Sequence, residues 1–213
     1  YFQWTHNSPS RNRVDPTPVN IMDVYVLTAD YATSYTEYLQ DLTGTITTPP
    51  APPTSSSLEL AYGELENYKA VSDTLVFNPA KFKPLFGNKA RSEFQATFKV
   101  IKNSNVNITD SEIRSKVLAY INAFFNTANW DFGETFYFTE LATYIQQGLA
   151  PNISSIIIVP NSASQVYGSL QQISSEPDEI LISCATVENI EVITAITAAQ
   201  LNLQNQSVNT IIN

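Results

Sequence analysis

The chain has 213 residues, which is enough for one domain of ordinary size or two small ones. Its formal net charge is -9, and only 15% of its residues are charged, against about 25% in a typical soluble domain. Nucleic-acid binding needs clustered Lys and Arg, and the densest cationic stretch (Lys81, Lys83, Lys89 and Arg91) is more typical of a solvated loop. We therefore expect no nucleic-acid partner and no adsorption to an anionic membrane.

The chain has no run of 18 apolar residues and no signal-peptide pattern at its start, so we expect no membrane-spanning segment. Its only methionine is Met22, which suggests a piece of a longer protein. The only cysteine, Cys184, lies in an apolar run and is predicted to be a buried small hydrophobe. With only one histidine, His6, a metal site or a histidine triad is hard to build, and we expect no metal and no cofactor.

The first 50 residues contain an arm, a strand and a helix. Three prolines and the disfavoured helical conformation before proline make residues 1–18 an extended arm. Residues 20–28 are rich in β-branched and aromatic side chains and predict a strand. Tyr31, Tyr35 and Tyr38 then recur at helical spacing, and Gly44 is placed to end the helix. This tyrosine stripe is either core or an interface, with core favoured.

Residues 44–57 contain four prolines and three consecutive serines, and predict an extended, semi-rigid strap. Within it, Pro50 and Pro53 are candidates for contact with a partner. Ser56 and Glu59 have capping-box spacing for a helix that continues through Leu58 to Val71.

The central residues give the clearest patterns. Residues 77–87 hold two prolines among aromatics and predict an irregular connection, whereas residues 93–100 alternate and predict a half-buried strand with Lys99 facing out. Thr109 and Glu112 form a second capping box, which predicts a helix with Ile113, Val117 and Ile121 on one stripe.

An aromatic turn at residues 130–134 follows this helix, and Thr139 is predicted to cap a shorter helix that ends at Leu149. Residues 152–159 then predict a strand with an apolar centre, covered on both sides. Three further strands are predicted at residues 167–173, 179–184 and 187–193.

This order of elements indicates an α+β fold: a mixed β-sheet covered by helices, with an extended N-terminal arm and a Pro-rich strap. The predicted organisation is an arm (residues 1–18), a strand-helix unit (19–48), the Pro/Ser-rich strap (49–57), a main α+β domain (58–200) and a polar tail (201–213).

Three acids, Asp131, Glu134 and Glu140, crowd the aromatic turn and its following helix. Paired carboxylates can act as a glycosidase dyad, but they also stabilise turns and first helical turns, which is the more common situation. Gly87-Asn88-Lys89 lacks the context of a phosphate loop, and Asp178-Glu179 lacks the series of oxygen ligands of a calcium loop. We therefore expect no catalytic residues and no small-molecule substrate.

Residues 113–125, the turn Trp130-Asp131-Phe132-Gly133-Glu134, residues 138–141 and residues 153–160 resemble the C-terminal part of the baseplate J-like family. The shared pattern is a helix, a short turn with Phe-Gly, a second capped helix, and a strand entered through a Pro-bearing loop. The wider layout, including residues 15–23, looks closest to the large baseplate wedge subunit of T-even-like contractile-tailed bacteriophages. The resemblance implies a structural family with no catalytic motif to carry over.

The resemblance implies a virion protein that is assembled in the host cytoplasm and links neighbouring wedge subunits into a ring around the tail hub. Its expected partners are further copies of itself and other wedge or hub proteins. The candidate contact residues are Tyr31, Tyr35, Tyr38, Pro50, Pro53, Trp130, Phe132 and Glu134. Two alternatives remain: a tail-associated carbohydrate-active enzyme and a receptor-binding module.

Overall fold

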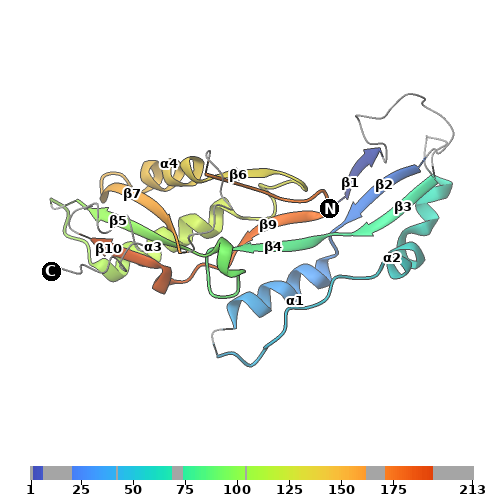
Figure 1. Cartoon of the computed structure of the whole chain (residues 1–213), viewed down its shortest axis with the longest axis horizontal. Helices are drawn as coiled ribbons and strands as arrows, with labels where there is room; N and C mark the ends of the chain where they lie inside the picture. The colour runs from blue at the N-terminus through green and yellow to red at the C-terminus, as the bar shows by residue number, and fades with distance from the viewer. Residues whose placement is uncertain are drawn as a thin grey trace, which may run out of the picture. The chain divides into compact units, whose positions relative to one another are not determined.

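The computed structural model describes residues 2–6, 21–41, 43–68, 74–103, 105–161 and 171–193, and it confirms the α+β class (Figure 1). The chain divides into two compact units. Unit 1 contains residues 1–82 and 176–180, and unit 2 contains residues 83–175 and 181–213. The division therefore falls after Phe82, whereas the predicted main domain begins at residue 58. The boundary between the units lies inside β4 (Lys81–Leu85) and inside β9 (Glu179–Ser183), two strands that pair with each other.

Unit 1 is built on a mixed three-stranded sheet. β2 (Ile21–Val26) lies in the middle, antiparallel to β1 (Phe2–His6) and parallel to β3 (Thr74–Pro79). Part of the predicted extended arm is thus a paired strand, and residues 7–20 lie outside the described part. One face of the sheet packs on α2 (Ser55–Tyr62) in an apolar cluster of Val24, Val26, Leu58, Leu75 and Phe77.

Helix α1 (Ala29–Gln40) packs through its tyrosine stripe. The rings of Tyr31 and Tyr35 lie 5.5 and 4.8 Å from that of Phe82 in β4, and Tyr38 packs edge-on against Tyr35. Gly44 does not end this helix. The carboxylate of Asp41 does so, because it accepts hydrogen bonds from the backbone N–H of Thr43 and of Ile46, just beyond the last turn.

The strap leads into a helix that is shorter than predicted. Residues 43–54 form no regular element, and α2 is capped by Thr54, whose side chain accepts from the Ser57 N–H, rather than by Ser56. After Tyr62 the chain tightens into the 3₁₀ helix η1 (Gly63–Asn67), and Val71 lies outside the described residues. The predicted α-helical continuation is therefore wrong for residues 63–68, and its last part, residues 69–71, lies outside the described residues.

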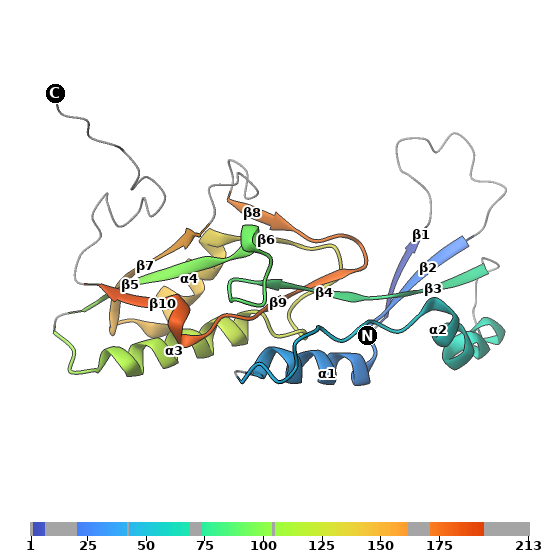
Figure 2. The ribbon, with the colours of Figure 1, turned by 60° about the horizontal axis from the view of Figure 1, so that its bottom comes forward.

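Unit 2 is built on a second mixed three-stranded sheet (Figure 2). Its central strand β5 (Ala96–Lys102) pairs antiparallel with β7 (Ile153–Pro160) and parallel with β10 (Ile190–Ile193). The predicted helices are α3 (Asp110–Phe124) and α4 (Phe138–Leu149), which pack on each other and on this sheet, α3 at β10 and α4 at β7. A short ladder of β6 (Thr135–Tyr137) and β8 (Gln172–Ser174) completes the unit.

Phe86 lies at the centre of the core of unit 2. Its ring is fully buried and meets the rings of Phe98, Phe125, Phe136 and Phe138 at centroid distances of 5.1 to 6.1 Å. Its φ angle is 78°, a left-handed conformation that is unusual for a bulky residue. The turn after β4 therefore adopts a strained backbone in order to place this ring among strands and helices.

The prediction that Lys99 points to solvent from a half-buried strand is wrong, because the structure buries this side chain. Its side chain is only 2% exposed, and its Nζ lies 3.3 Å from Oε2 of Glu191 on the neighbouring strand β10. Lys99 on β5 and Glu191 on β10 are therefore paired in the sheet and carry opposite charges. The aliphatic part of the lysine is buried and the glutamate is half exposed. Sequence alternation alone does not reveal this pair, because Glu191 is distant in the chain.

Other local predictions were also wrong. Residues 77–87 are not an irregular connection but the end of β3 and all of β4, with Pro79 at a strand end and Pro84 near one. Residues 92–94 form the 3₁₀ helix η2 (Ser92–Phe94) before β5 begins, and η4 (Val187–Asn189) precedes β10. The N-cap of α4 is Tyr137, not Thr139. Most of the predicted strand 167–173 and the tail 201–213 lie outside the described residues.

Gly87 follows Phe86 and is predicted to be required for packing. A Cβ added to Gly87 would overlap the backbone carbonyl of Cys184. Because a backbone carbonyl cannot move aside as a flexible side chain does, we expect Gly87→Ala to destabilise the protein by about 2–4 kcal/mol. The measurement is the midpoint and slope of urea unfolding followed by circular dichroism.

Gly63→Ala is the matched control, since Gly63 has a right-handed helical backbone and its added Cβ would meet nothing closer than 4.0 Å. We expect it to change the free energy of unfolding by less than about 1 kcal/mol. Equal effects of the two substitutions would contradict the packing role of Gly87.

Candidate functional site: an acidic, aromatic hollow at the helix corner

Side chains of the segment between α3 and β6, the helix corner, bind the C-terminal end of α3. The last carbonyl groups of a helix lack intrahelical partners. Here the indole Nε1 of Trp130 donates to the carbonyl of Phe124 at 2.7 Å, and the Asn129 side-chain amide donates to that of Ala123 at 2.9 Å. The predicted turn therefore acts as the C-terminal cap of α3.

The ring of Trp130 packs into the core of unit 2 in addition to capping α3. It lies parallel to Phe125 at 5.4 Å and edge-on to Phe124 at 5.6 Å. Trp130 is 8% exposed and Phe132 5% exposed. Both predicted contact residues therefore serve mainly to pack unit 2.

Glu134 and Gly133 shape the turn itself. Gly133 has a φ of 74°, which glycine adopts without strain. One carboxylate oxygen of Glu134, Oε2, accepts from the Asp131 N–H at 2.9 Å, and the Glu134 carbonyl accepts from both the N–H and the hydroxyl of Ser175. The side chain of Glu134 thus holds the turn closed. Its carbonyl connects the turn to Ser175, the residue that follows β8.

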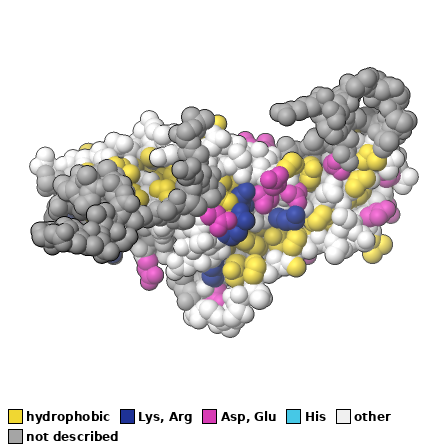
Figure 3. Space-filling model, in the orientation of Figure 1, with side chains coloured by type: hydrophobic (Ala, Val, Ile, Leu, Met, Phe, Trp, Pro, Cys, Tyr) yellow, Lys and Arg dark blue, Asp and Glu magenta, His cyan; other side chains and the backbone are white. Residues whose placement is uncertain are grey.

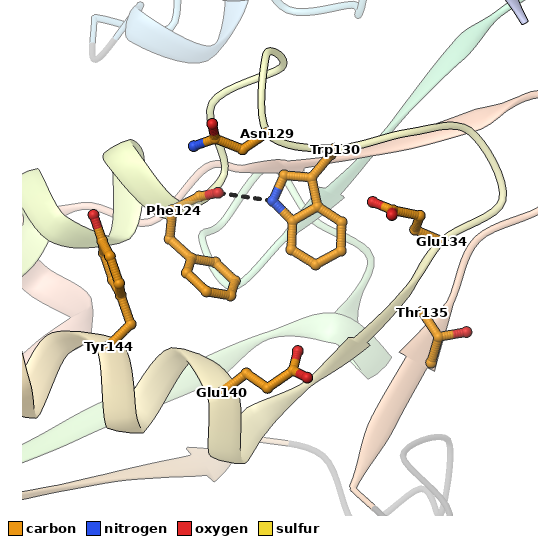
Figure 4. A pocket seen from close by; sticks show the side chains of 7 residues that line it. All are labelled: Phe124, Asn129, Trp130, Glu134, Thr135, Glu140 and Tyr144. Atoms are coloured by element: carbon orange, nitrogen blue, oxygen red, sulfur yellow. Dashed lines mark hydrogen bonds between the residues drawn. The ribbon is translucent and has the colours of Figure 1, made fainter.

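A hollow of about 490 Å³ opens beside this corner, between the turn and α4 (Figure 4). Glu134 reaches into it from the turn, beside the Trp130 ring, and Glu140 from the first turn of α4. The remaining lining residues are Phe124, Asn129, Thr135 and Tyr144. Of the three acids that the sequence places near the turn, the structure brings two together here and leaves Asp131 outside the lining.

No protein-family model matches the chain. A search of curated proteins also finds no match. The resemblance to the baseplate J-like family therefore rests on the sequence pattern alone, and the function that it implies is a proposal.

The other predicted contact residues lie in unit 1. Tyr31, Tyr35 and Tyr38 are each less than a tenth exposed, so the structure places them in the core and leaves a partner little of them to touch. Pro50 and Pro53 are half-buried and line a second hollow, of about 550 Å³, together with residues of α1 and α2. The strap therefore lies against its own unit along these prolines.

Several patterns that suggested chemistry have structural roles. The carboxylate of Asp178 accepts from Nζ of Lys81 at 2.6 Å, and this hydrogen bond raises the pKa of Lys81. Lys83 donates to the Ser174 carbonyl, and Arg91 pairs with Glu93 while lying over the Phe94 ring. Each of these three cations is held within its own unit.

Two features were missed by the sequence analysis. Tyr144 on α4 is not among the predicted contact residues, but it is 40% exposed and lines the hollow. Leu60 is 91% exposed, and no pattern in the sequence marks it as a surface residue; Tyr68 is 82% exposed. Within the described ranges, no helix is both long and apolar enough to cross a membrane.

We expect Trp130→Phe to destabilise the protein by about 1–3 kcal/mol, because the Phe124 carbonyl loses its donor. Urea unfolding followed by circular dichroism measures this loss. Tyr144→Phe is the matched control: its hydroxyl has no partner among the described residues, so we expect a change within about 0.5 kcal/mol. If both variants unfold at the same urea concentration, the capping role of Trp130 is wrong.

Cys184 is predicted to be unreactive in the folded protein. Its thiol is buried and donates to the Leu85 carbonyl at 3.3 Å, and burial raises its pKa. The thiolate, which is the nucleophile, is therefore disfavoured even at mildly alkaline pH. We expect Ellman's reagent to titrate no thiol at pH 8 in the native protein and one in urea; fast labelling of the native protein would contradict this arrangement.

Proposed function

We propose that the chain is a structural component of a phage tail baseplate, a wedge subunit that links neighbouring subunits into a ring through protein–protein contacts. The observation that carries this proposal is the set of large apolar side chains that unit 1 presents to solvent. Leu60 and Tyr68 are almost fully exposed, and Leu65 and Val76 are more than a third exposed. Large apolar residues that lie together on a folded surface are typical of sites that bind other proteins.

These residues come from consecutive elements of one unit. Leu60 lies on α2, Leu65 on η1 and Tyr68 directly after it. Val76 lies on β3, on the sheet face away from α2, because its neighbours Leu75 and Phe77 pack against Leu58. Figure 3 shows hydrophobic side chains at the surface over α2 and β3. The opposite side of α2 is already used, because Leu58 packs on the sheet. The exposed side chains are thus available to a partner without unfolding of unit 1.

The helix corner supports the same proposal from another direction. Glu134 is engaged in closing the turn, and Trp130 and Phe132 are packed into the core. A rigid corner of this kind suits a subunit that transmits a change through its interfaces by repacking. The resemblance of residues 113–160 to the baseplate J-like family gives the particular assembly.

The proposal predicts association in solution or with other tail proteins. We expect the purified chain to form dimers or larger species in sedimentation velocity, alone or after mixing with baseplate proteins produced from neighbouring genes. The double variant Leu60→Ser/Tyr68→Ser should raise the dissociation constant at least about tenfold, since hot-spot truncations commonly remove more than about 1.4 kcal/mol.

Val187→Ser is the control, because it removes a 43% exposed apolar side chain from unit 2. We expect it to leave the association unchanged. A monodisperse monomer that joins no tail assembly at high concentration would contradict the proposal.

A carbohydrate-active enzyme is the second candidate, and one observation favours it: Glu134 and Glu140 share a hollow with Trp130 and Tyr144. Two carboxylates that flank a glycosidic bond are the usual equipment of glycosidases. Glu140→Gln should then abolish the cleavage of at least one polysaccharide in a host-surface panel. Absence of cleavage by the unmodified chain across that panel would exclude this candidate.

A further inference from the structure

We infer that the hollow beside the helix corner seats the guanidinium group of an arginine from a partner protein. The inference rests on the proposed function only in that the partner is taken to be a protein; the chemistry of the hollow is argued from its own residues. Those residues differ from the exposed apolar ones of unit 1, so the inference concerns a separate contact.

The first step is the charge of the lining. Two of its seven residues, Glu134 and Glu140, are acidic, and none is a lysine or arginine. Glu140 is exposed and has no hydrogen bond or ion pair among the described residues. Its carboxylate therefore keeps its full capacity to bind a cation.

The second step is the balance of donors and acceptors. The indole N–H of Trp130 and the amide N–H of Asn129 already donate to the end of α3, and the Thr135 hydroxyl is paired with that of Ser174. Glu134 uses one oxygen, Oε2, to hold the turn. What remains for a ligand is mainly acceptors: the other oxygen of Glu134, both oxygens of Glu140 and the side-chain oxygen of Asn129. The Tyr144 hydroxyl and the second N–H of the Asn129 amide are the remaining donors. A ligand rich in donors fits this set, and an anion does not.

The third step is the aromatic wall. The rings of Phe124 and Tyr144 lie 5.4 Å apart and both line the hollow, and Tyr144 is 40% exposed. A planar guanidinium stacks on such rings and presents five N–H donors in a fixed fork, whereas the ammonium of lysine does neither. Glu134 and Glu140 enter the same hollow from the turn and from α4, so a guanidinium seated there lies near carboxylates from two elements (Figure 4).

A sugar is the main competitor for this hollow, and the structure favours it less. Sugar recognition by aromatic residues requires a broad exposed ring face, and the largest ring here, Trp130, is only 8% exposed. A neutral sugar also gains less than a cation from two carboxylates without a counter-charge. The two occupants can be separated by direct titration.

The test is an NMR titration of the full ¹⁵N-labelled chain with N-acetyl-arginine methylamide. The chain has two tryptophans, so two indole signals are expected, and a Trp4→Phe variant assigns that of Trp130. We expect the arginine derivative to shift the Trp130 signal saturably at millimolar concentration. The neutral isostere N-acetyl-citrulline methylamide and methyl β-glucoside should leave it in place.

Glu140→Gln should weaken arginine binding about tenfold, since it removes a charge-assisted hydrogen bond. Glu188→Gln removes one exposed carboxylate elsewhere in unit 2 and should change nothing. A shift produced equally by citrulline or the glucoside, or unchanged binding by Glu140→Gln, would overturn the inference.

The outcome is distinguishable from failure of the proposed function. If arginine does not bind but the chain still associates through its apolar surface, only the inference about the hollow is wrong. If arginine binds as expected but the chain joins no tail assembly, the baseplate proposal fails while the arginine site stands.

Discussion

The burial of the Phe86 ring stabilises the left-handed backbone that Phe86 adopts. Much of unit 2 depends on this balance between backbone strain and ring burial. A bulky residue in this conformation costs about 1–3 kcal/mol. Full burial of a phenylalanine side chain contributes about 1.5–3 kcal/mol. Each of the four ring contacts of Phe86 adds about 0.5–1.5 kcal/mol beyond area burial. The balance favours the strained turn, which joins β4 to β5, the end of α3, β6 and α4 through one side chain.

The helix corner depends on the same core. Phe125 and Phe136 touch both Phe86 and Trp130, so the ring that caps α3 is held by the rings that hold Phe86. This arrangement fixes the turn from which Glu134 reaches into the hollow. The hollow is therefore preformed, and a partner would meet acceptors and aromatic edges that are already in place. Recognition of this kind requires no rearrangement of unit 2 and suits a subunit that must keep its shape in an assembly.

The sequence predicts the helices of unit 2 well and its surface poorly, for a physical reason. Strong local signals, such as the capping residue Thr109 and the stripe of Ile113 and Val117, determine α3 without help from distant residues. The burial of Lys99 could not be predicted, because its partner Glu191 is almost a hundred residues away and only sheet pairing brings them together. Likewise, Trp130 was correctly placed in a turn, but nothing local shows that its indole would cap the preceding helix. In the hollow, Glu134 and Glu140 stand out in the sequence as charged residues near the turn, whereas Asn129 and Tyr144 carry no comparable signal.

The parallel pairing of β10 with β5 has a consequence for biosynthesis. β5 ends at Lys102, and its neighbour β10 begins at Ile190, so the ribosome releases the central strand long before one of its two partners exists. Unit 1 has the same dependence, since it includes residues 176–180. Neither unit can complete its fold before residues 176–193 have been synthesised, because unit 1 includes residues 176–180 and unit 2 includes β10. Both edges of β5 are unpaired until β7 is made, and one edge stays unpaired until β10 follows. Chaperones protect intermediates of this kind, which otherwise aggregate.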